Sequence, residues 1–363
     1  MANDFLKFFP VGNGDSTLIK AGDKTVMTDI HYRQSCKDDN SDEYDFLKEL
    51  MSACKKGKEY RLSLFVSTHP DQDHTKGFDE IFHVGAPAGF DTKNGKILIE
   101  EIWCSPYTAN PHYETDDSKA LIKEIKRRKG ILGTDEGKKD GNRLIILDLN
   151  SNPTSGEIGK HLKWDLLAPT GEEANIEKSD DPEKPNSSNN SSLVIRWTYV
   201  DQSTAEYIIL GGDAEVEIWE RIRADFSDSD LKWSILLAPH HCSRCSMARK
   251  NEDDEYEYSD DSLSALGQVH GDGFIVASSK PIKKDDDNPP SWDAKQKYLK
   301  ILRESYEDDH TDRFLNPESY KNGKPETVVF ELSHKGLKLK SIGYASAASI
   351  AGSGAGSKPT TYG

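Results

Sequence analysis

The sequence predicts an α/β protein. Short runs of β-branched and aliphatic residues alternate with polar turns from the start of the chain. The segment 45–55 has apolar residues at helical spacing and precedes a strand at 62–67, which ends in a loop of carboxylate and imidazole side chains. A helix is expected from Gly77 onward. Strand, loop and helix in this order indicate α/β organisation rather than an all-β sandwich.

The first half of the chain opens on a β-meander. Polar turns at 12–15 and 21–24 separate its three strands. In 45–55 the apolar residues recur every three or four positions, which is the period of one helix face. The strands expected here are 5–9, 17–20, 25–28, 62–67, 97–103 and 144–149, and the helices are 45–55 and 120–128.

The second half continues the alternation. Its most apolar runs are bounded by turn residues, and one helical segment near 215–226 lies between two of them. The strands expected here are 164–167, 192–199, 206–210, 233–237, 273–277, 327–333 and 336–341.

We expect one large domain over 1–344. Runs of Asp, Glu and Lys near 106–142, 171–190, 250–262 and 280–315 are most simply charged insertions made of solvated loops and helix faces. The tail 345–363 is rich in Ala, Gly and Ser, a composition typical of a flexible segment.

Composition restricts the partners. The 363 residues include 63 acidic and 47 basic side chains, and the formal net charge is -16. Such a balance opposes non-specific binding of the whole protein to nucleic acid or to an anionic membrane. Hydrophobic residues make up 35%, which fits a globular core with charged surface segments.

Targeting and cysteine usage point to the cytoplasm. The first residues lack a signal peptide's basic start and apolar stretch, and no run approaches the ~20 apolar residues of a membrane span. Five scattered cysteines do not form a disulfide framework. Cys242 and Cys245 form a Cys-x-x-Cys pair that suits redox or metal chemistry, but no second pair completes a four-cysteine zinc site.

The chemistry is concentrated in one loop. His69, Asp71, Asp73 and His74 occupy six positions directly after a predicted strand. Imidazole together with carboxylate suits zinc, manganese or iron, and the loop has enough ligands for two ions. The alternative is a polar turn that happens to hold two histidines.

Two later strands also end in ligand-type residues. Asp213 follows one of them, and His240 with His241 follows the next. Taken by itself, Asp213 would be interpreted as a turn residue that caps a helix. The two histidines, taken by themselves, would be interpreted as a surface pair or as buried core residues. Because strand ends bring distant residues together in α/β folds, the three places jointly predict a metal site.

These motifs resemble the metallo-β-lactamase superfamily, and within it the soluble relatives of the ComEC-type DNA-uptake hydrolase domain. The segment 68–74 is similar to the superfamily's His-x-His-x-Asp-His signature, and 11–19 with Thr28-Asp29 is similar to the branch's first strands and turn. The segments 190–195, 210–215 and 238–246 look like its later motifs. The resemblance spans about residues 5 to 340 and implies an αββα sandwich with metal ions held at one edge between the two sheets.

The resemblance also implies residue roles. The first metal site would take His69 and Asp71, the second site Asp73 and His74, and Asp213 would bridge the two ions. His240 would complete the second site, while His241 would lie behind the ligands or face the substrate, as a catalytic residue together with Asp73. The resemblance leaves open which of the two histidines is the ligand. Asp29 would hold a ligand imidazole in the correct tautomer.

The chain departs from the family pattern at several positions. Asp71 stands where the second His is usual, and Asn189 or Asn190 falls where a third-motif His is expected. The first site is therefore richer in oxygen, which favours manganese over zinc or leaves only the second site occupied. Cys242 replaces the usual Gly after the paired histidines, and a later His-Pro element reads Asn288-Pro289.

The expected function is that of a metal-dependent hydrolase that activates water on one or two divalent cations, Zn or Mn. A phosphodiesterase or nuclease that acts on DNA or RNA is favoured by the resemblance. One alternative is a hydrolase of a small phosphoester or nucleotide. Another is a weakly active module of a multi-protein defence system, with the acidic insertions as partner surfaces and no membrane contact. Candidate substrate contacts are Lys76, Asn190, Ser191 and Arg244.

Overall fold

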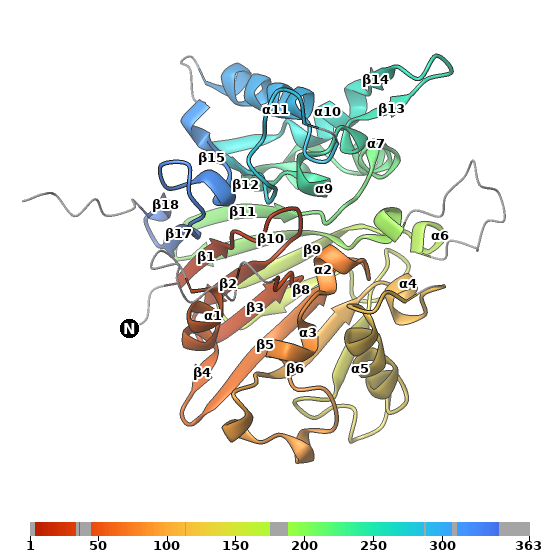
Figure 1. Cartoon of the computed structure of the whole chain (residues 1–363), viewed down its shortest axis with the longest axis vertical. Helices are drawn as coiled ribbons and strands as arrows, with labels where there is room; N and C mark the ends of the chain where they lie inside the picture. Colours follow the sequence, from red (N-terminus) through yellow and green to blue (C-terminus); the bar gives the residue numbers. More distant parts are fainter. Residues whose placement is uncertain are drawn as a thin grey trace, which may run out of the picture.

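The computed structural model describes residues 4–33, 36, 45–112, 114–174, 188–286, 288–306 and 311–340. Two large mixed β-sheets form its centre (Figure 1). The first sheet has the order β18-β17-β1-β2-β3-β5-β6-β7, and β4 pairs with β5. Its strands are β1 Asp4–Phe8, β2 Thr17–Ala21, β3 Lys24–Thr28, β4 Lys55–Lys56, β5 Glu59–Ser67, β6 Leu98–Cys104, β7 Arg143–Ile146, β17 Val328–Ser333 and β18 Gly336–Leu339.

The second sheet has the order β16-β15-β12-β11-β10-β9-β8. Strands β8 to β11 form an antiparallel meander, and β11, β12, β15 and β16 run parallel. The bounds are β8 Ser155–Ile158, β9 Leu162–Ala168, β10 Val194–Asp201, β11 Thr204–Leu210, β12 Trp233–Leu237, β15 Val269–Val276 and β16 Phe314–Leu315.

The main hydrophobic core lies between the two sheets. Because strand side chains alternate between faces, Ile235 and Leu237 of β12 enter this core while Leu236 packs on the outer side. Leu64 and Val66 of β5 enter the same core from the first sheet. Burial of this apolar surface stabilises the face-to-face packing of the two sheets, and this packing fixes the positions of the sheet edges relative to each other.

Helices cover both outer faces. Helices α1 Phe46–Cys54, α3 Phe78–Ile81 and α5 Lys119–Lys129 pack on the first sheet. Helices α7 Val216–Asp225, α10 Asp260–Leu266 and α11 Trp292–Ser305 pack on the second sheet, as Figure 1 shows. The layers are therefore helix, sheet, sheet, helix, which confirms the predicted αββα sandwich.

Short elements complete the chain. Single-turn helices are α2 Gln72–Thr75, α4 Pro106–Ala109, α6 Gly171–Ala174, α8 Asp228–Leu231 and α9 Pro239–Cys242. The 3₁₀ turns are η2 Pro87–Gly89, η3 Thr92–Asn94, η4 Ser188–Ser191, η5 Arg244–Ser246, η6 Thr311–Arg313 and η7 Pro317–Ser319. Strands β13 Ala248–Lys250 and β14 Tyr256–Tyr258 form a projecting hairpin (Figure 1).

Three of the expected charged insertions contain core helices, and the first of these helices is α5 within the 106–142 stretch. The 280–315 stretch holds α11, which is capped by Ser291 and buries Tyr298 and Leu302 completely. Its charges occupy the solvent face, as in any amphipathic helix. The 250–262 stretch likewise holds β14 and the start of α10. The expected tail at 345–363 lies outside the described residues.

Within the part of the chain that the structure describes, no helix combines the length and the apolarity needed to cross a membrane.

Candidate metal centre

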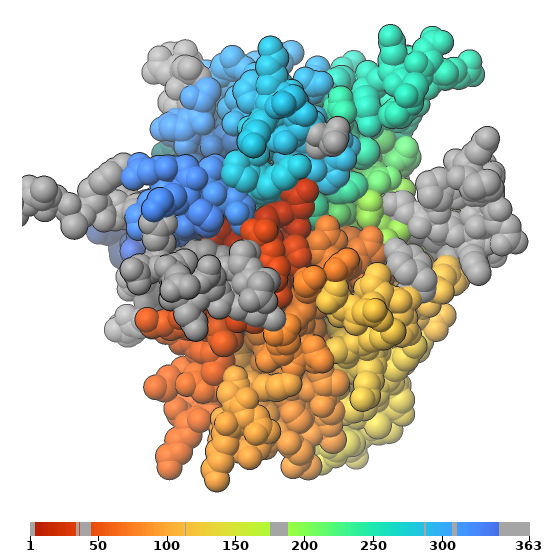
Figure 2. All heavy atoms as spheres, in the orientation of Figure 1, coloured from red at the N-terminus to blue at the C-terminus, as the bar shows by residue number. Residues whose placement is uncertain are grey.

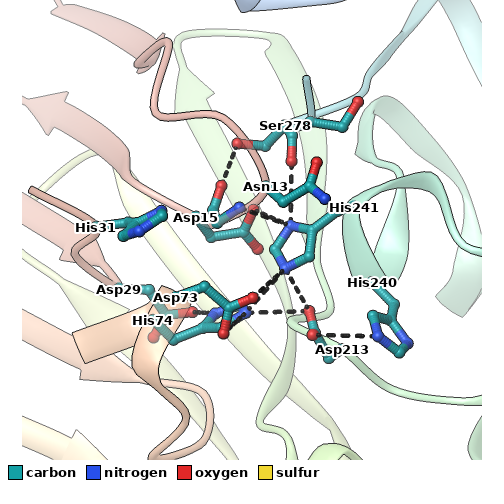
Figure 3. Close-up of polar contacts among 12 residues, drawn as sticks. Asn13, Asp15, Asp29, His31, Asp73, His74, Asp213, His240, His241 and Ser278 are labelled. Atoms are coloured by element: carbon teal, nitrogen blue, oxygen red, sulfur yellow. Dashed lines mark hydrogen bonds and ion pairs between the residues drawn. The ribbon is translucent and has the colours of Figure 1, made fainter. Parts of the chain in front are cut away.

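Three strand ends meet at one edge of the sandwich. β5 of the first sheet ends at Ser67 and leads into the ligand loop. In the second sheet β11 leads to Asp213, and its parallel neighbour β12 leads to His240 and His241. Figure 3 shows the carboxylate and imidazole groups from these elements turned toward one another.

One group of side chains, here called the second subsite, consists of Asp73, His74, His241 and the Oδ1 atom of Asp213. The Nε2 atoms of His74 and His241 are 3.3 Å apart. Asp213 Oδ1 lies 3.1 Å from His74 Nε2 and 3.4 Å from His241 Nε2. Asp73 Oδ2 lies 3.2 Å from His241 Nε2. Two imidazole nitrogens and two carboxylates therefore converge on one small volume.

The first subsite consists of His69, Asp71, His240 and the other carboxylate oxygen of Asp213. Asp213 Oδ2 lies 3.6 Å from His240 Nε2 and 3.9 Å from His69 Nε2. His69 Nε2 lies 3.8 Å from Asp71 Oδ2. The two oxygens of Asp213 thus face different subsites, which is the arrangement that a bridging carboxylate needs.

The paired histidines take the opposite places from those expected. His241 joins the second subsite, whereas His240 faces Asp213 Oδ2 and the first subsite. The reason is a backbone turn in which His240, His241 and Cys242 all have positive φ, at 51°, 52° and 65°. Left-handed backbone is unfavourable for residues with a Cβ, so this turn has to be held by its surroundings. The His240 N–H donates to the Gly212 carbonyl at 3.0 Å, which ties the turn to the end of β11.

Asp29 lies where the resemblance placed it, behind a ligand imidazole. Its Oδ2 atom is 2.8 Å from His74 Nδ1 and also accepts from the Thr68 hydroxyl at 2.6 Å. Its Oδ1 atom accepts from the Thr68 N–H at 2.8 Å. A carboxylate at Nδ1 keeps the proton there, which leaves the Nε2 lone pair of His74 free for a cation.

Asp15 is a neighbour of the centre that the sequence did not suggest. It is buried, and its Oδ1 atom lies 3.6 Å from His241 Nδ1. The same nitrogen lies 3.0 Å from the Ser278 carbonyl and 3.2 Å from the Gly14 N–H. One ligand atom from each of Asp15, His74, Asp213 and His241 fits within 4.8 Å. The acidic turn at 12–15 after the first strand was the available signal.

The first subsite has different support. His69 Nδ1 faces the hydroxyls of Thr68 at 3.1 Å and Ser192 at 3.3 Å. Ser188 donates its hydroxyl to Asp71 Oδ1 at 2.7 Å. Glu215 Oε1 lies 3.9 Å from His240 Nδ1. Hydroxyl and carboxylate oxygens therefore dominate this side of the centre, as the replacement at Asp71 predicts.

Burial and charge together set the protonation of the centre. Burial would raise the pKa of Asp213, but the neighbouring His241 and His74 hold that pKa well below its ordinary value. Burial would lower the pKa values of His74 and His241, but Asp213 raises both well above the usual range. Burial lowers the pKa of His69. Without a cation, the charge of Asp213 therefore favours protonation of the second subsite's imidazoles, whose Nε2 atoms lie 3.3 Å apart.

The residues present fit divalent cations. Every ion pair that the described residues give to Asp15, Asp29, Asp73 or Asp213 is with a histidine, so no Lys or Arg compensates these carboxylates. The buried atoms His69 Nε2 and Asp213 Oδ1 have no hydrogen-bond partner among the described groups, although Oδ1 lies 3.1 Å from His74 Nε2. A cation between these imidazoles and the buried carboxylate would bind the carboxylate directly, in place of the poorly aligned hydrogen-bond donors.

The candidate substrate contacts divide into two pairs. Asn190 and Ser191 lie in η4, beside the first subsite, and the Asn190 Oδ1 atom is buried without a partner in the described chain. Ser191 donates to the Ser188 carbonyl at 2.7 Å. Lys76 faces Asp117 at 3.8 Å, and Arg244 lies between Asp293 at 3.5 Å and the Tyr256 ring at 4.1 Å. Both cations already have counter-charges or aromatic partners.

The Cys-x-x-Cys pair is not an activated thiol site. Burial raises the pKa of Cys242 to about 12, so its thiolate is not available near neutral pH. Cys245 accepts from the Asn288 side chain at 3.3 Å, and both cysteines are free.

The fold is an αββα sandwich. No protein-family model and no curated protein sequence matches the chain. Among solved structures, a metallo-β-lactamase fold protein from Bacillus subtilis is 12% identical, with 64% of this chain and 70% of that chain covered and a TM-score of 0.30. A metallo hydrolase from the archaeon Ignicoccus hospitalis is 11% identical, with 90% and 99% covered and a TM-score of 0.38. A diphosphatase of the PhnP family is 11% identical, with 87% and 84% covered and a TM-score of 0.35. At such identities and TM-scores none of these likenesses carries an activity over to this chain.

Proposed function

We propose that this protein is a metal-dependent hydrolase of phosphodiesters in DNA or RNA. One observation carries the proposal: Asp213 is buried and presents one oxygen to each of two His and Asp subsites. That arrangement suits two neighbouring cations, Zn or Mn. Such ions would lower the pKa of water to near neutrality and neutralise charge on the attacked phosphate.

The protein's own residues define the direction of approach. His69, His74 and His241 are fully buried, whereas the Asp73 side chain is 36% exposed and the Asp71 side chain 26% exposed. Substrate therefore reaches the centre past these two carboxylates. Asp73 combines exposure with a 3.2 Å contact to His241, so we assign it the role of orienting the attacking water.

The turn at 12–15 forms one wall of this entrance. The Asp15 N–H donates to the Asp73 carbonyl at 3.1 Å, and the Lys280 N–H donates to Asn13 Oδ1 at 3.0 Å. Figure 2 shows the N-terminal segment in contact with the segment that contains α2 on one side and with the segment near residue 280 on the other. These contacts fix the Asp73 backbone and so limit how far its carboxylate can move.

A phosphodiester is favoured over other esters by the oxygen-rich first subsite. Asp71, Asp213 and the nearby Glu215 provide hard ligands, which suit the ions that also bind phosphate oxygens. Asn190 and Ser191 of η4 adjoin this subsite and are our candidates for contacts to the phosphate.

A small phosphoester or nucleotide is the competing substrate. The net charge of -16 and the carboxylates at the entrance disfavour a grip on long duplexes. Hydrolysis of a nucleotide or another small phosphoester without cleavage of DNA or RNA would support this alternative. A partner-binding module is the third reading, with the acidic surface segments as its contact region.

The test is metal analysis together with hydrolysis assays. Purified protein would be analysed for bound Zn and Mn and assayed on bis(p-nitrophenyl) phosphate, single-stranded and duplex DNA, and RNA. Asp213→Asn and His74→Ala should bind less metal and lose activity by ~100-fold or more, as expected when a metal ligand is removed. Asp135→Asn is the matched control because that side chain is 96% exposed. If the wild type binds no metal and hydrolyses no substrate, the enzyme proposal fails.

A further inference from the structure

His31 lies beside the metal centre, and backbone hydrogen bonds to neighbouring segments of the centre hold its loop in place. It follows β3 by three positions, and its N–H donates to the Ser16 hydroxyl at 2.9 Å. The N–H of the preceding Ile30 donates to the His74 carbonyl at 3.1 Å. The loop is therefore attached both to the end of the 12–15 turn and to the ligand loop, independently of the His31 side chain.

The His31 ring occupies space that exists only because residue 14 is glycine. A Cβ on Gly14 would lie 1.9 Å from His31 Nδ1 and 2.8 Å from the Asp73 carbonyl oxygen. The ring and the Asp73 backbone thus approach the same glycine from two sides. In Figure 3 the imidazole lies next to Asp15, on the same side of the centre as Asp29.

The hydrogen-bonding capacity of the His31 Nδ1 atom is unused. The Nδ1 atom is buried and has no hydrogen-bond partner in the described chain, although His31 as a whole is partly exposed. A buried polar atom without a partner costs free energy, so such an atom calls for a functional explanation. The other imidazoles near the centre each face a carboxylate or a neighbouring imidazole.

The imidazole is uncharged near neutral pH. Burial is the main cause that lowers its pKa to about 4, and the charges that act on it include Asp73, His74 and His241. A neutral imidazole has one N–H to donate and one lone pair to accept. It can therefore donate its N–H to an oxygen atom of a substrate.

We propose that His31 contacts the substrate and donates its imidazole N–H to a phosphate oxygen beside Asp73. This inference rests on the proposed phosphodiesterase function and deepens it. His31 is not needed for the ligand set, because the subsites are complete without it. Its contribution is to orient the phosphate and to stabilise negative charge on an oxygen as the ester bond breaks.

The test compares His31→Ala with His31→Asn and His31→Gln, which place an amide donor near Nδ1 and Nε2 respectively. Turnover of bis(p-nitrophenyl) phosphate, metal content and the affinity of the metal-loaded protein for inorganic phosphate would be measured for each. His83→Ala is the matched control, since that imidazole bonds only locally, to the Ala86 carbonyl at 3.1 Å.

We expect His31→Ala to lose ~10-fold to 100-fold in kcat/KM, the range for one hydrogen bond to a charged group, with wild-type metal content. One of the two amide variants should recover part of that loss. Activity of His31→Ala within twofold of wild type would overturn the proposal, and so would a loss of bound metal.

Failure of the proposed function has a different signature. If the wild type hydrolyses none of the substrates, phosphate affinity still decides on His31: weaker phosphate binding by His31→Ala supports the contact, and unchanged binding overturns it. If the metal-loaded wild type neither hydrolyses substrate nor binds phosphate, both proposals fail together.

Discussion

Replacing Asp29 with Asn should weaken cation binding mainly at the second subsite. Asp29 is fully buried and makes three short contacts, one to His74 Nδ1 at 2.8 Å and two to Thr68 at 2.8 and 2.6 Å. Asn keeps the shape of the side chain but removes its charge and turns one acceptor into a donor. Either the amide N–H then faces the Thr68 N–H, or it faces His74 Nδ1 and favours the tautomer with the proton on Nε2, the atom that would bind the cation.

The magnitude follows from the role of the lost charge. Carboxylates behind a ligand imidazole typically contribute 10-fold to 100-fold in metal affinity, or about 1.4 to 2.8 kcal/mol. We therefore expect Asp29→Asn to weaken the tighter of the two cation-binding steps by about this factor. The weaker step should lose less, because Asp29 reaches His69 through the Thr68 hydroxyl and not by direct contact, and Ser192 gives His69 a second hydroxyl neighbour.

The assay is a competition titration of the metal-free protein with Zn in the presence of a chromophoric chelator. The control is Asp135→Asn, which removes an equal charge from an exposed position. Unchanged affinity at both steps, or equal losses at both, would refute the assignment of Asp29 to His74. A folded variant is confirmed by circular dichroism before the titration.

Three further predictions concern stability. First, the protonated forms of His74 and His241 stabilise the metal-free protein fully below about pH 6.5, and this contribution is lost as the pH rises through their raised pKa values. With Zn bound, the protein should instead be more stable at the higher pH. In thermal melts the protein with chelator should therefore have its higher melting temperature at pH 6, and the Zn-bound protein should have its higher melting temperature at pH 9. Second, Gly212→Ala should destabilise by about 2 kcal/mol or more, since its Cβ would lie 2.7 Å from Thr68, whereas Gly271→Ala, which is also at positive φ but in open space, should cost only about 1 kcal/mol; equal losses in urea unfolding would contradict this. Third, Tyr298→Phe should leave stability unchanged or raise it by about 1 kcal/mol, because the buried hydroxyl has no hydrogen-bond partner in the described chain; a loss above about 1 kcal/mol in the same assay would show that the hydroxyl is satisfied.

The secondary structure was largely readable from local pattern. The predicted strand at 233–237 coincides with β12, and the strands on either side of the ligand loop differ from prediction by only a few residues. These segments have strong period-2 or apolar patterns, which depend on residues close in sequence. The helix α11 was missed because its charges obscured an apolar stripe of Ala294, Tyr298 and Leu302 at helical spacing.

The ligand-rich loop at 69–74 and the residues Asp213, His240 and His241 were identifiable from the sequence because each follows an apolar strand. Their types predicted a cation site, and the structure brings them together at one sheet edge. Residue type and position relative to a strand end are local properties, and they sufficed for this much.

Only the tertiary structure decided which histidine serves which subsite. The left-handed turn at 240–242 places His241 next to His74, and His240 next to Asp213 Oδ2. Hydrophobic periodicity in the sequence does not predict such a turn. Tertiary packing also brings Asp15 and His31 to the centre. Asp15 is 226 positions from His241, which it contacts, and the His31 ring packs against Gly14. The sequence thus determined the strands and the kinds of ligand, whereas the packing of two sheets determined their partners, because distances between residues far apart in the chain are set by the core and not by local pattern.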